Sequence, residues 1–211
     1  MNHSHKAGLA CYMLLILCFG YAAAGVARAD TVTFTGTRTN QTPGAAPGGR
    51  CSPAFTVNIN PRPGTADFST GTSNFGDFTS VQSHCITPPI PAPFDNGLFT
   101  WTFAGGDTLT GTYSGALTGI FNPTMTSVLN DTEMYIVTGG TGIFAGATGN
   151  ILGVGTVTFT PGILPLSNVV LNGTITTVPE PATMLLLGTG LAAVVAKVRR
   201  RRKTHCDDAA A

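Results

Sequence analysis

The sequence has few charged residues, and its long middle part is especially poor in cations. Charged residues make up 10% of the 211 residues. Between Asp30 and Thr177 there are three arginines, no lysine and seven acidic residues, so this part has a net charge of −4. Nucleic-acid binding needs a clustered basic surface. The sequence therefore predicts no nucleic-acid partner.

The same part lacks the sequence elements of common enzymes. Asp77, Ser83 and His84 have the residue types of a hydrolytic triad, but neighbours on a strand point to opposite faces. No Gly-x-Ser-x-Gly turn is present to hold a nucleophile. Asp131 and Glu133 are two carboxyl groups, as glycosidases need, but their place at the start of a predicted strand favours solvation. We predict no catalytic residue, no metal site and no cofactor.

The N-terminus has the layout of a secretory signal peptide. Lys6 precedes an apolar run from Leu9 to Phe19, and small residues follow as far as Ala27 and Ala29. A basic start, a short apolar stretch and an Ala-x-Ala exit are typical of chains that signal peptidase cleaves. We predict that residues 1–29 are removed. The alternative is a retained membrane anchor, for which the run is short.

The C-terminus combines a stiff neck, an apolar stretch and a basic cluster. The neck is Val178-Pro179-Glu180-Pro181, in which the prolines favour extended backbone. Residues 182–198 are apolar except for one lysine and predict a transmembrane helix of about 25 Å. The cluster that follows would hold this end in the cytoplasm; it consists of Arg199, Arg200, Arg201, Arg202 and Lys203.

This three-part order over residues 178–203 resembles the PEP-CTERM sorting signal. The resemblance implies that the membrane peptidase exosortase cleaves near Pro179-Glu180-Pro181 and releases or transfers the exported part. It also implies a Gram-negative host, a precursor anchored in the inner membrane, and a final place at the cell surface or in the extracellular matrix. Proteins of this group accompany exopolysaccharide and biofilm formation. Residues 204–211 would form a short cytoplasmic tail, and a plain single-pass anchor is the alternative.

Cysteine is scarce in the part that would be exported. Only Cys51 and Cys85 lie between the two terminal segments. In an oxidising compartment, two cysteines most simply form one disulfide. Closing a loop of 34 residues would contribute about 3 kcal/mol. The alternative is metal binding by both cysteines and His84, although no repeated ligand spacing supports it.

Residues 30–177 are predicted to form one all-β domain. Short runs alternate threonine with apolar residues, and turn residues separate them, which is typical of sandwiches and barrels. The predicted strands lie at residues 31–37, 54–60, 98–103, 108–113, 134–137, 156–160 and 169–176. Residues 40–52 and 87–97 are rich in glycine or proline and are predicted to be loops.

A glycine-rich segment stands out at residues 138–155. Ile143 and Phe144 are predicted to pack inward, and Gly146 and Gly149 to allow close approach of neighbouring backbone. Its spacing formally matches a dinucleotide fingerprint, but no acidic residue follows and glycines disfavour the required helix. The key positions of the segment are Gly139, Gly140, Gly142, Phe144, Gly146 and Gly149.

This segment resembles one in allene oxide cyclase and dirigent proteins. The resemblance implies a single antiparallel β-barrel of about eight strands, here flanked by the signal helix and the transmembrane helix. Our leading interpretation is a non-enzymatic, exosortase-processed protein of the surface or matrix. The alternative is a small barrel that binds a ligand or acts as a cyclase or isomerase. A cavity inside the barrel with converging polar groups would favour the alternative.

Overall fold

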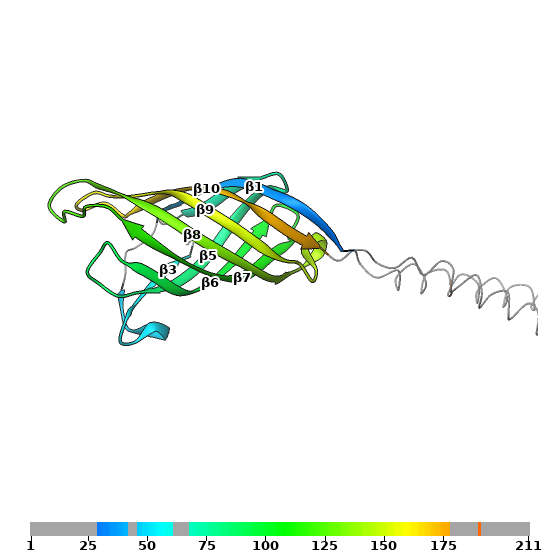
Figure 1. The fold of residues 1–211 in the computed structure, drawn as a ribbon, viewed down its shortest axis with the longest axis horizontal. Coiled ribbons are helices and arrows are strands. Elements are labelled where there is room, and N and C mark those ends of the chain that lie inside the picture. The colour runs from blue at the N-terminus through cyan, green and yellow to red at the C-terminus, as the bar shows by residue number, and fades with distance from the viewer. Residues whose placement is uncertain (1–28, 42–45, 61–67, 178–189, 191–211) are drawn as a thin grey trace, which may run out of the picture. The chain divides into compact units, whose positions relative to one another are not determined.

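A computed structural model describes residues 29–41, 46–60, 68–177 and 190 (Figure 1). Eight long strands account for most of them. They are β1 (Asp30–Gln41), β4 (Phe68–Ser73), β5 (Gly76–Ile86), β6 (Pro93–Phe103), β7 (Thr108–Thr118), β8 (Ser127–Gly140), β9 (Thr148–Phe159) and β10 (Leu166–Thr177). Shorter elements are β2 (Ala46–Pro47), β3 (Phe55–Ile59) and two 3₁₀ turns, η1 (Gly49–Cys51) and η2 (Gly142–Phe144).

The eight long strands close into an antiparallel barrel. They follow the order β5-β4-β1-β10-β9-β8-β7-β6, and pairing of β6 with β5 completes the ring. β3 extends the wall beyond the short β4 by pairing with the other half of β5. Closure leaves no edge within the ring, which removes the usual risk of strand-to-strand aggregation. The predicted eight-stranded antiparallel barrel is confirmed.

Alternation along the strands separates an inner from an outer face. In β8, every second residue from Ser127 to Val137 is buried, and the residues between them are exposed. Successive side chains of a strand point to opposite faces, so the buried set lines the barrel interior. The outer face carries many threonines, some of which pair across strands, as Thr37 does with Thr72. Threonine suits this position because its β-branched side chain favours a pleated backbone.

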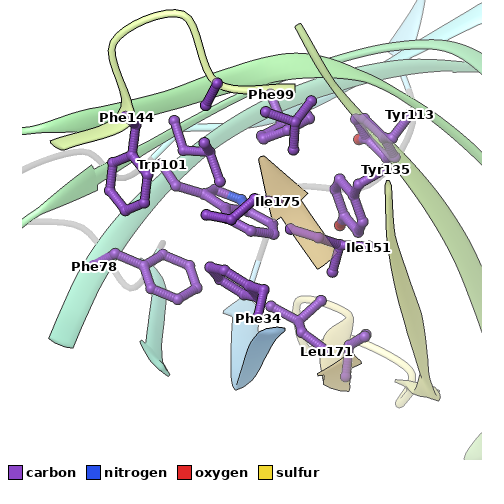
Figure 2. Packing of buried hydrophobic residues seen from close by; sticks show 14 of the residues in the cluster. Phe34, Phe78, Phe99, Trp101, Tyr113, Tyr135, Phe144, Ile151, Leu171 and Ile175 are labelled. Atoms are coloured by element: carbon purple, nitrogen blue, oxygen red, sulfur yellow. The ribbon is translucent and has the colours of Figure 1, made fainter. Parts of the chain in front are cut away.

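Half of the interior is filled by aromatic and aliphatic side chains (Figure 2). Trp101 is fully buried at its centre and stacks on Phe78, with 5.0 Å between ring centroids. Phe144 of η2 packs on Phe103 and belongs to the same cluster. Trp101, Phe78, Phe103 and Phe144 lie in the half of the barrel toward the end where Asp30 pairs with Thr177, which is called the aromatic half below. Other members of the cluster, such as Ile86 and Phe94, lie beyond it.

The glycine-rich segment forms the η2 turn and the start of β9, not a helix. Phe144 is buried as predicted, whereas the prediction for Ile143 is wrong because its side chain is 58% exposed. Gly146 adopts a φ of 65°, which glycine tolerates without strain. A side chain at Gly149 would collide with the carbonyl oxygen of Thr174, so the predicted close backbone approach is confirmed there.

Several elements differ from the sequence prediction. β4 and β5 were not predicted, and β6 begins at Pro93, inside a predicted loop. β8 and β9 begin well before the predicted strands at 134–137 and 156–160, and β1 and β2 occupy parts of the predicted loop 40–52. Pro93 is the first residue of its strand, where the missing N–H is tolerated. A bulge between Phe94 and Gly97 also lets the strand continue through a segment with an irregular pattern.

Within the described residues, no helix has the length and apolar character needed to cross a membrane. Apart from Ala29 and Gly190, the predicted signal peptide and the predicted helix at 182–198 lie outside them. The same holds for Ala27, for the neck from Val178 to Pro181 and for the basic cluster.

Candidate functional site

A polar cluster occupies the interior of the barrel beyond the aromatic half. Its centre is Arg38 on β1, which is 1% exposed. Arg38 forms an ion pair with Glu133 on β8, with 2.9 Å between Nη2 and Oε1. Its Nη1 donates to Gln82 Oε1 at 2.9 Å and to the hydroxyl of Tyr135. The barrel thus brings together residues that are 44 to 97 positions apart in the sequence.

Asn40 completes the partners of Arg38. With its amide oxygen turned toward the guanidinium, Asn40 accepts from Nε at 3.0 Å and from Nη2 at 3.1 Å, and its amide nitrogen donates to Ser69 Oγ. Every N–H of a guanidinium can donate one hydrogen bond. All of those on Arg38 therefore have an acceptor within the protein.

Glu133 is equally well satisfied. Its Oε1 accepts from Arg38, and its Oε2 accepts from the hydroxyl of Tyr135 at 2.6 Å. Burial is the largest single effect and lowers the pKa of Arg38, but Glu133, Tyr135 and Tyr113 together outweigh it and raise this pKa above its ordinary value. Burial raises the pKa of Tyr135, so its hydroxyl keeps its proton and serves as the donor. The cluster is a closed charge pair with little capacity left for a further partner.

Asp131 lies two residues from Glu133 on the same face of β8, and it differs from the rest of the cluster. It is 3% exposed. Its Oδ2 accepts a hydrogen bond from Ser167 Oγ at 3.3 Å, while its Oδ1 has no partner among the described residues. Burial, and then repulsion from Glu133, raises the pKa of this carboxyl from 3.8 to about 7. A buried acceptor without a partner is costly, and in native proteins such groups often mark a site for a water, an ion or a ligand.

Asp131 borders a cavity of about 90 Å³ inside the barrel. Apolar side chains form most of the wall, among them Ile59, Ile86 and Leu117. The cavity lies away from the end marked by Asp30 and Thr177, because its lining includes Asn40 and Ser167, which pair at the far ends of β1 and β10. The polar residues of the lining are Arg38, Asn40, His84, Asp131, Glu133 and Ser167.

His84 lines the cavity and also contacts the aromatic side chains of Tyr113 and Phe94. It sits at a bulge of β5, its Nδ1 is 2.7 Å from the hydroxyl of Tyr113, and its ring lies on that of Phe94. Burial, helped by the positive charge of Arg38, lowers the pKa of this imidazole to about 3. His84 is therefore neutral at ordinary pH and adds no charge to the cavity.

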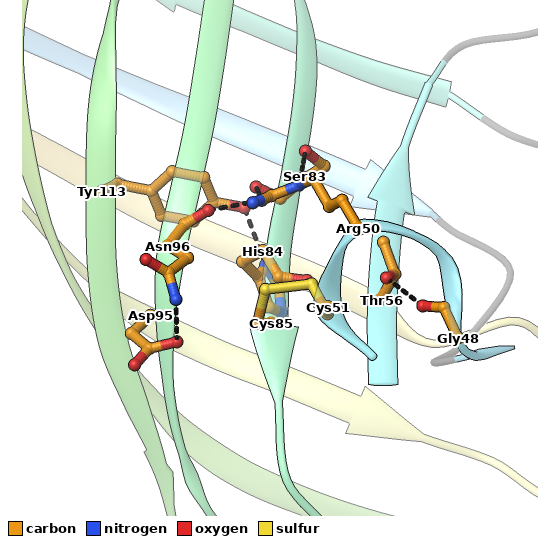
Figure 3. The surroundings of a disulfide bond; sticks show 10 residues. All are labelled: Gly48, Arg50, Cys51, Thr56, Ser83, His84, Cys85, Asp95, Asn96 and Tyr113. Atoms are coloured by element: carbon orange, nitrogen blue, oxygen red, sulfur yellow. Dashed lines mark hydrogen bonds between the residues drawn. A yellow bond between two sulfur atoms is a disulfide. The ribbon is translucent and has the colours of Figure 1, made fainter. Parts of the chain in front are cut away.

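The predicted disulfide between Cys51 and Cys85 is present, with an S–S distance of 2.03 Å (Figure 3). It ties η1 to the outer side of β5. Arg50 strengthens the attachment, since its Nε donates to Ser83 Oγ at 3.1 Å and its Nη2 to the carbonyl oxygen of Ser83 at 2.7 Å. Both thiols are used in the bond, so the alternative of a metal site at these cysteines is wrong.

The structure does not bring together Asp77, Ser83 and His84, the three residues with the types of a hydrolytic triad. Ser83 bonds to Arg50 beside the disulfide, whereas His84 bonds to Tyr113 (Figure 3). Asp77 is exposed at the other end of β5. No hydrogen bond links any two of these three side chains, and a nucleophile needs a base within hydrogen-bond reach.

The prediction that solvation explains Asp131 and Glu133 is wrong. Each is 3% exposed, because β8 begins at Ser127 and places both inside the barrel. Sequence reasoning also missed Arg38, Asn40 and Gln82 as interior residues. The spacing of Leu129, Asp131 and Glu133 at every second position was an available signal, since it puts the acidic pair on the same face as an apolar residue.

An open groove of about 870 Å³ runs along the outer face beside η1. Leu98, Met134 and Ile136 line it and are each 43–51% exposed. No buried polar group without a partner points into this groove among the described residues, so the interior cavity is the better candidate site.

Comparison with known proteins identifies the C-terminal segment. Residues 177–202 match the PEP-CTERM protein-sorting motif. This motif confirms the resemblance drawn from Pro179-Glu180-Pro181 and the basic cluster, and it implies an exported protein that exosortase processes. PEP-CTERM covers only the tail and assigns no role to the barrel.

Other comparisons add little about the barrel. It is similar to the pterocarpan synthase dirigent protein GePTS1, at 13% identity over 73% of this chain and 94% of that chain, with a TM-score of 0.29. The barrel assignment therefore rests on the strand pairing described above. No curated protein matches the chain.

Asp131 and His84 make opposite contributions to the dependence of stability on pH. A carboxyl whose pKa is raised on folding, here from 3.8 to about 7, contributes stability below its unfolded pKa and loses it as the pH rises toward 7. An imidazole whose pKa is lowered, here from 6.5 to about 3, contributes stability above 6.5 and loses it as the pH falls toward 3. The two slopes oppose each other in the unmodified protein.

Replacing Asp131 with asparagine should separate the two slopes. The unmodified protein loses the contribution of Asp131 as the pH rises, whereas asparagine does not titrate. The free energy of unfolding of Asp131→Asn, relative to that of the unmodified protein, should therefore increase by on the order of 2–4 kcal/mol as the pH rises from about 4 to about 7. Urea unfolding at several pH values measures the difference. Asp77→Asn, at an exposed position, is the matched control and should give a constant difference. A constant difference for Asp131→Asn as well would contradict the assignment.

Proposed function

We propose that this chain is an exported, exosortase-processed protein that acts at the cell surface or in the extracellular matrix without catalysing a reaction. The PEP-CTERM match at residues 177–202 is the observation that carries the proposal. It begins at the last residue of β10, Thr177, so the sorting signal directly follows the folded domain. A Gram-negative host and an association with exopolysaccharide and biofilm are further parts of the proposal.

The first and last residues of the barrel domain pair with each other, which suits cleavage near both ends of the chain. Asp30, the first residue after the predicted signal-peptidase site, pairs with Thr177, the last residue before the neck. Cleavage after Ala29 and cleavage near Pro179-Glu180-Pro181 would therefore release the complete barrel without removing part of any strand. This supports a temporary anchor, from which the domain is released or transferred intact.

The interior supports a role other than catalysis. The strongest charges, Arg38 and Glu133, are engaged with each other and with Tyr135. Ser83, His84 and Asp77 have separate surroundings. In the described part of the chain, no nucleophile with an adjacent base stands out, which favours a binding or structural role.

Replacing Pro179, Glu180 and Pro181 with alanine tests the sorting proposal in the native host. We expect a longer product that stays in the membrane fraction, because exosortase would no longer recognise the neck. Alanine replacement of residues 204–206, in the predicted cytoplasmic tail, is the matched control and should leave mass and fractionation unchanged.

Intact mass spectrometry of the mature protein reports both cleavage sites and any attached group. Intact masses of the neck variant and the unmodified protein that differ only by the three substitutions, together with identical fractionation, would overturn processing by exosortase. A mature N-terminus other than Asp30 would overturn the predicted signal-peptidase site alone.

A second candidate function is ligand binding by the barrel, with or without a cyclase-like or isomerase-like reaction. The interior cavity and the unpartnered Oδ1 of Asp131 favour it. Binding is compatible with export and sorting, because the sorting motif begins at Thr177, whereas Ser167, which lines the cavity, lies at the other end of β10. A surface protein that captures a small molecule would satisfy both observations.

A further inference from the structure

Among the described residues that line the barrel cavity, Asp131 has a buried side-chain oxygen, Oδ1, that accepts no hydrogen bond. Of the two carboxyl groups beside the cavity, Glu133 accepts from Arg38 and from Tyr135. Asp131 accepts only from Ser167, through Oδ2. Leaving a buried acceptor without a partner costs about 1–3 kcal/mol. A ligand group that donates a hydrogen bond to Oδ1 would recover that cost.

The charges around the cavity favour a donor and disfavour an anion. Arg38 has all its N–H groups engaged and its charge balanced by Glu133. Burial keeps the pKa of His84 at about 3, so the imidazole is neutral. The hydroxyls of Tyr113 and Tyr135 stay protonated, since burial raises the pKa of each. Among the described residues that line the cavity, Asp131 is thus the group whose charge is not balanced by a partner, and this charge is negative once the pH exceeds the pKa of about 7.

The remaining wall is apolar and limits the size of the occupant. Ile59, Ile86, Ile90, Leu117 and Val157 line it. An apolar cavity of about 150 Å³ holds a benzene molecule, so a cavity of about 90 Å³ encloses a smaller group. Carbon atoms of a ligand would contact this wall, while its donor group would face Asp131.

We propose that this cavity binds a small ligand that places one hydrogen-bond donor, a hydroxyl or a primary ammonium, against Asp131 and about four non-hydrogen atoms against the apolar wall. The proposal rests on the second candidate function, ligand binding by the barrel. It adds the chemical class of the ligand and the residue that selects it.

Three probes of nearly equal shape separate the possibilities. Isobutylamine carries an ammonium, isobutanol a hydroxyl and isobutyrate a carboxylate on the same branched body. Each is added to the full chain in nanodiscs of zwitterionic lipid, with the isoleucine methyl groups labelled for NMR. Ile59, Ile86 and Ile90 report from the cavity wall. Ile136, which is 49% exposed on the outer face, reports binding elsewhere.

We expect the amine and the alcohol to shift and saturate the signals of the cavity isoleucines, and the carboxylate to leave them unchanged. Asp131→Asn should weaken the amine about tenfold or more, because its charge partner is lost. It should weaken the alcohol at most about threefold, because the amide oxygen still accepts a hydrogen bond. The exposed Asp77→Asn should change neither affinity.

Each contrary result has a distinct meaning. If no probe shifts the three cavity isoleucines, the cavity is not a binding site. If isobutyrate binds as tightly as isobutylamine, the donor class is wrong while ligand binding stands. Equal affinity of the unmodified protein and Asp131→Asn for the amine would remove Asp131 as the selecting residue. The sorting proposal is untouched by all three, because mass and fractionation test it separately.

A measurement on the unmodified protein guards against a variant that does not fold. The carboxyl of Asp131 is raised to a pKa of about 7, so its charge increases across neutral pH. The affinity for isobutylamine should therefore rise about thirtyfold between about pH 5.5 and pH 8, while that for isobutanol changes little. Equal pH profiles for the two probes would overturn the proposal.

Discussion

Replacing Arg38 with methionine is expected to lower the free energy of unfolding by about 3–5 kcal/mol. The change leaves the carboxylate of Glu133 buried without its cation, at 3% exposure. It also leaves Gln82 and Asn40 without the donor that both share. Methionine fills much of the same volume, so the loss reports charge and hydrogen bonding more than packing. Urea unfolding of the processed protein at neutral pH, followed by circular dichroism, measures it.

Two further variants identify the cause of that loss. Arg38→Met combined with Glu133→Leu removes both charges and should recover much of the lost stability, because a buried ion pair can often be replaced by apolar residues. Arg50→Met, at an exposed arginine, should cost only about 1 kcal/mol. A double variant as unstable as Arg38→Met alone would show that the ion pair is not the source of the loss.

The β-strand fold could be predicted largely from the threonines that alternate with apolar residues and lie on the outer face. Threonine alternates with apolar residues in β1, β6 and β7, and this period-two pattern belongs to half-buried strands. The disulfide could be predicted because only two cysteines lie in the domain. Both results depend on local pattern or simple elimination, which a single sequence provides.

The strands that were missed have polar residues on both faces. In β5 the inward positions include Ser80, Gln82 and His84, so the run shows no apolar alternation. β4 is short and contains Gly71, whose place a larger residue could not take because Phe78 lies against it. Their strand character comes from pairing partners supplied by closure of the barrel, which no local pattern encodes.

The candidate site was missed for the same reason. A buried arginine or carboxylate looks like a surface residue unless its partner is known. Arg38 and Glu133 are 95 positions apart, and only the barrel places them face to face. Tyr135 and Gln82, which complete the network, are also distant in the sequence and meet only in the closed barrel. A polar interior of this kind is therefore found from which face of each strand a residue occupies and from how the strands close into a ring, not from composition.

Replacing Trp101 with alanine is expected to lower the free energy of unfolding by about 3–5 kcal/mol. Trp101 is fully buried, and its ring lies against those of four aromatic residues at centroid distances of 4.9–5.4 Å, namely Phe34, Phe78, Phe99 and Tyr135. Removing the indole leaves a cavity that the rigid wall of a closed barrel cannot easily fill. Because Trp101 is the only tryptophan in the chain, unfolding is followed by circular dichroism.

Trp101→Phe distinguishes packing from hydrogen bonding. The indole N–H of Trp101 has no acceptor among the described residues, so phenylalanine loses part of the volume but no hydrogen bond. We expect a cost of about 1–2 kcal/mol, well below that of alanine. Tyr135 touches Trp101 on one side and bonds to Arg38 and Glu133 on the other. The alanine variant should therefore also shift the isoleucine signals of the cavity, and unchanged signals would mean that the aromatic half does not support the polar cluster. An equal cost for both variants would mean that lost packing volume is not the cause of the loss.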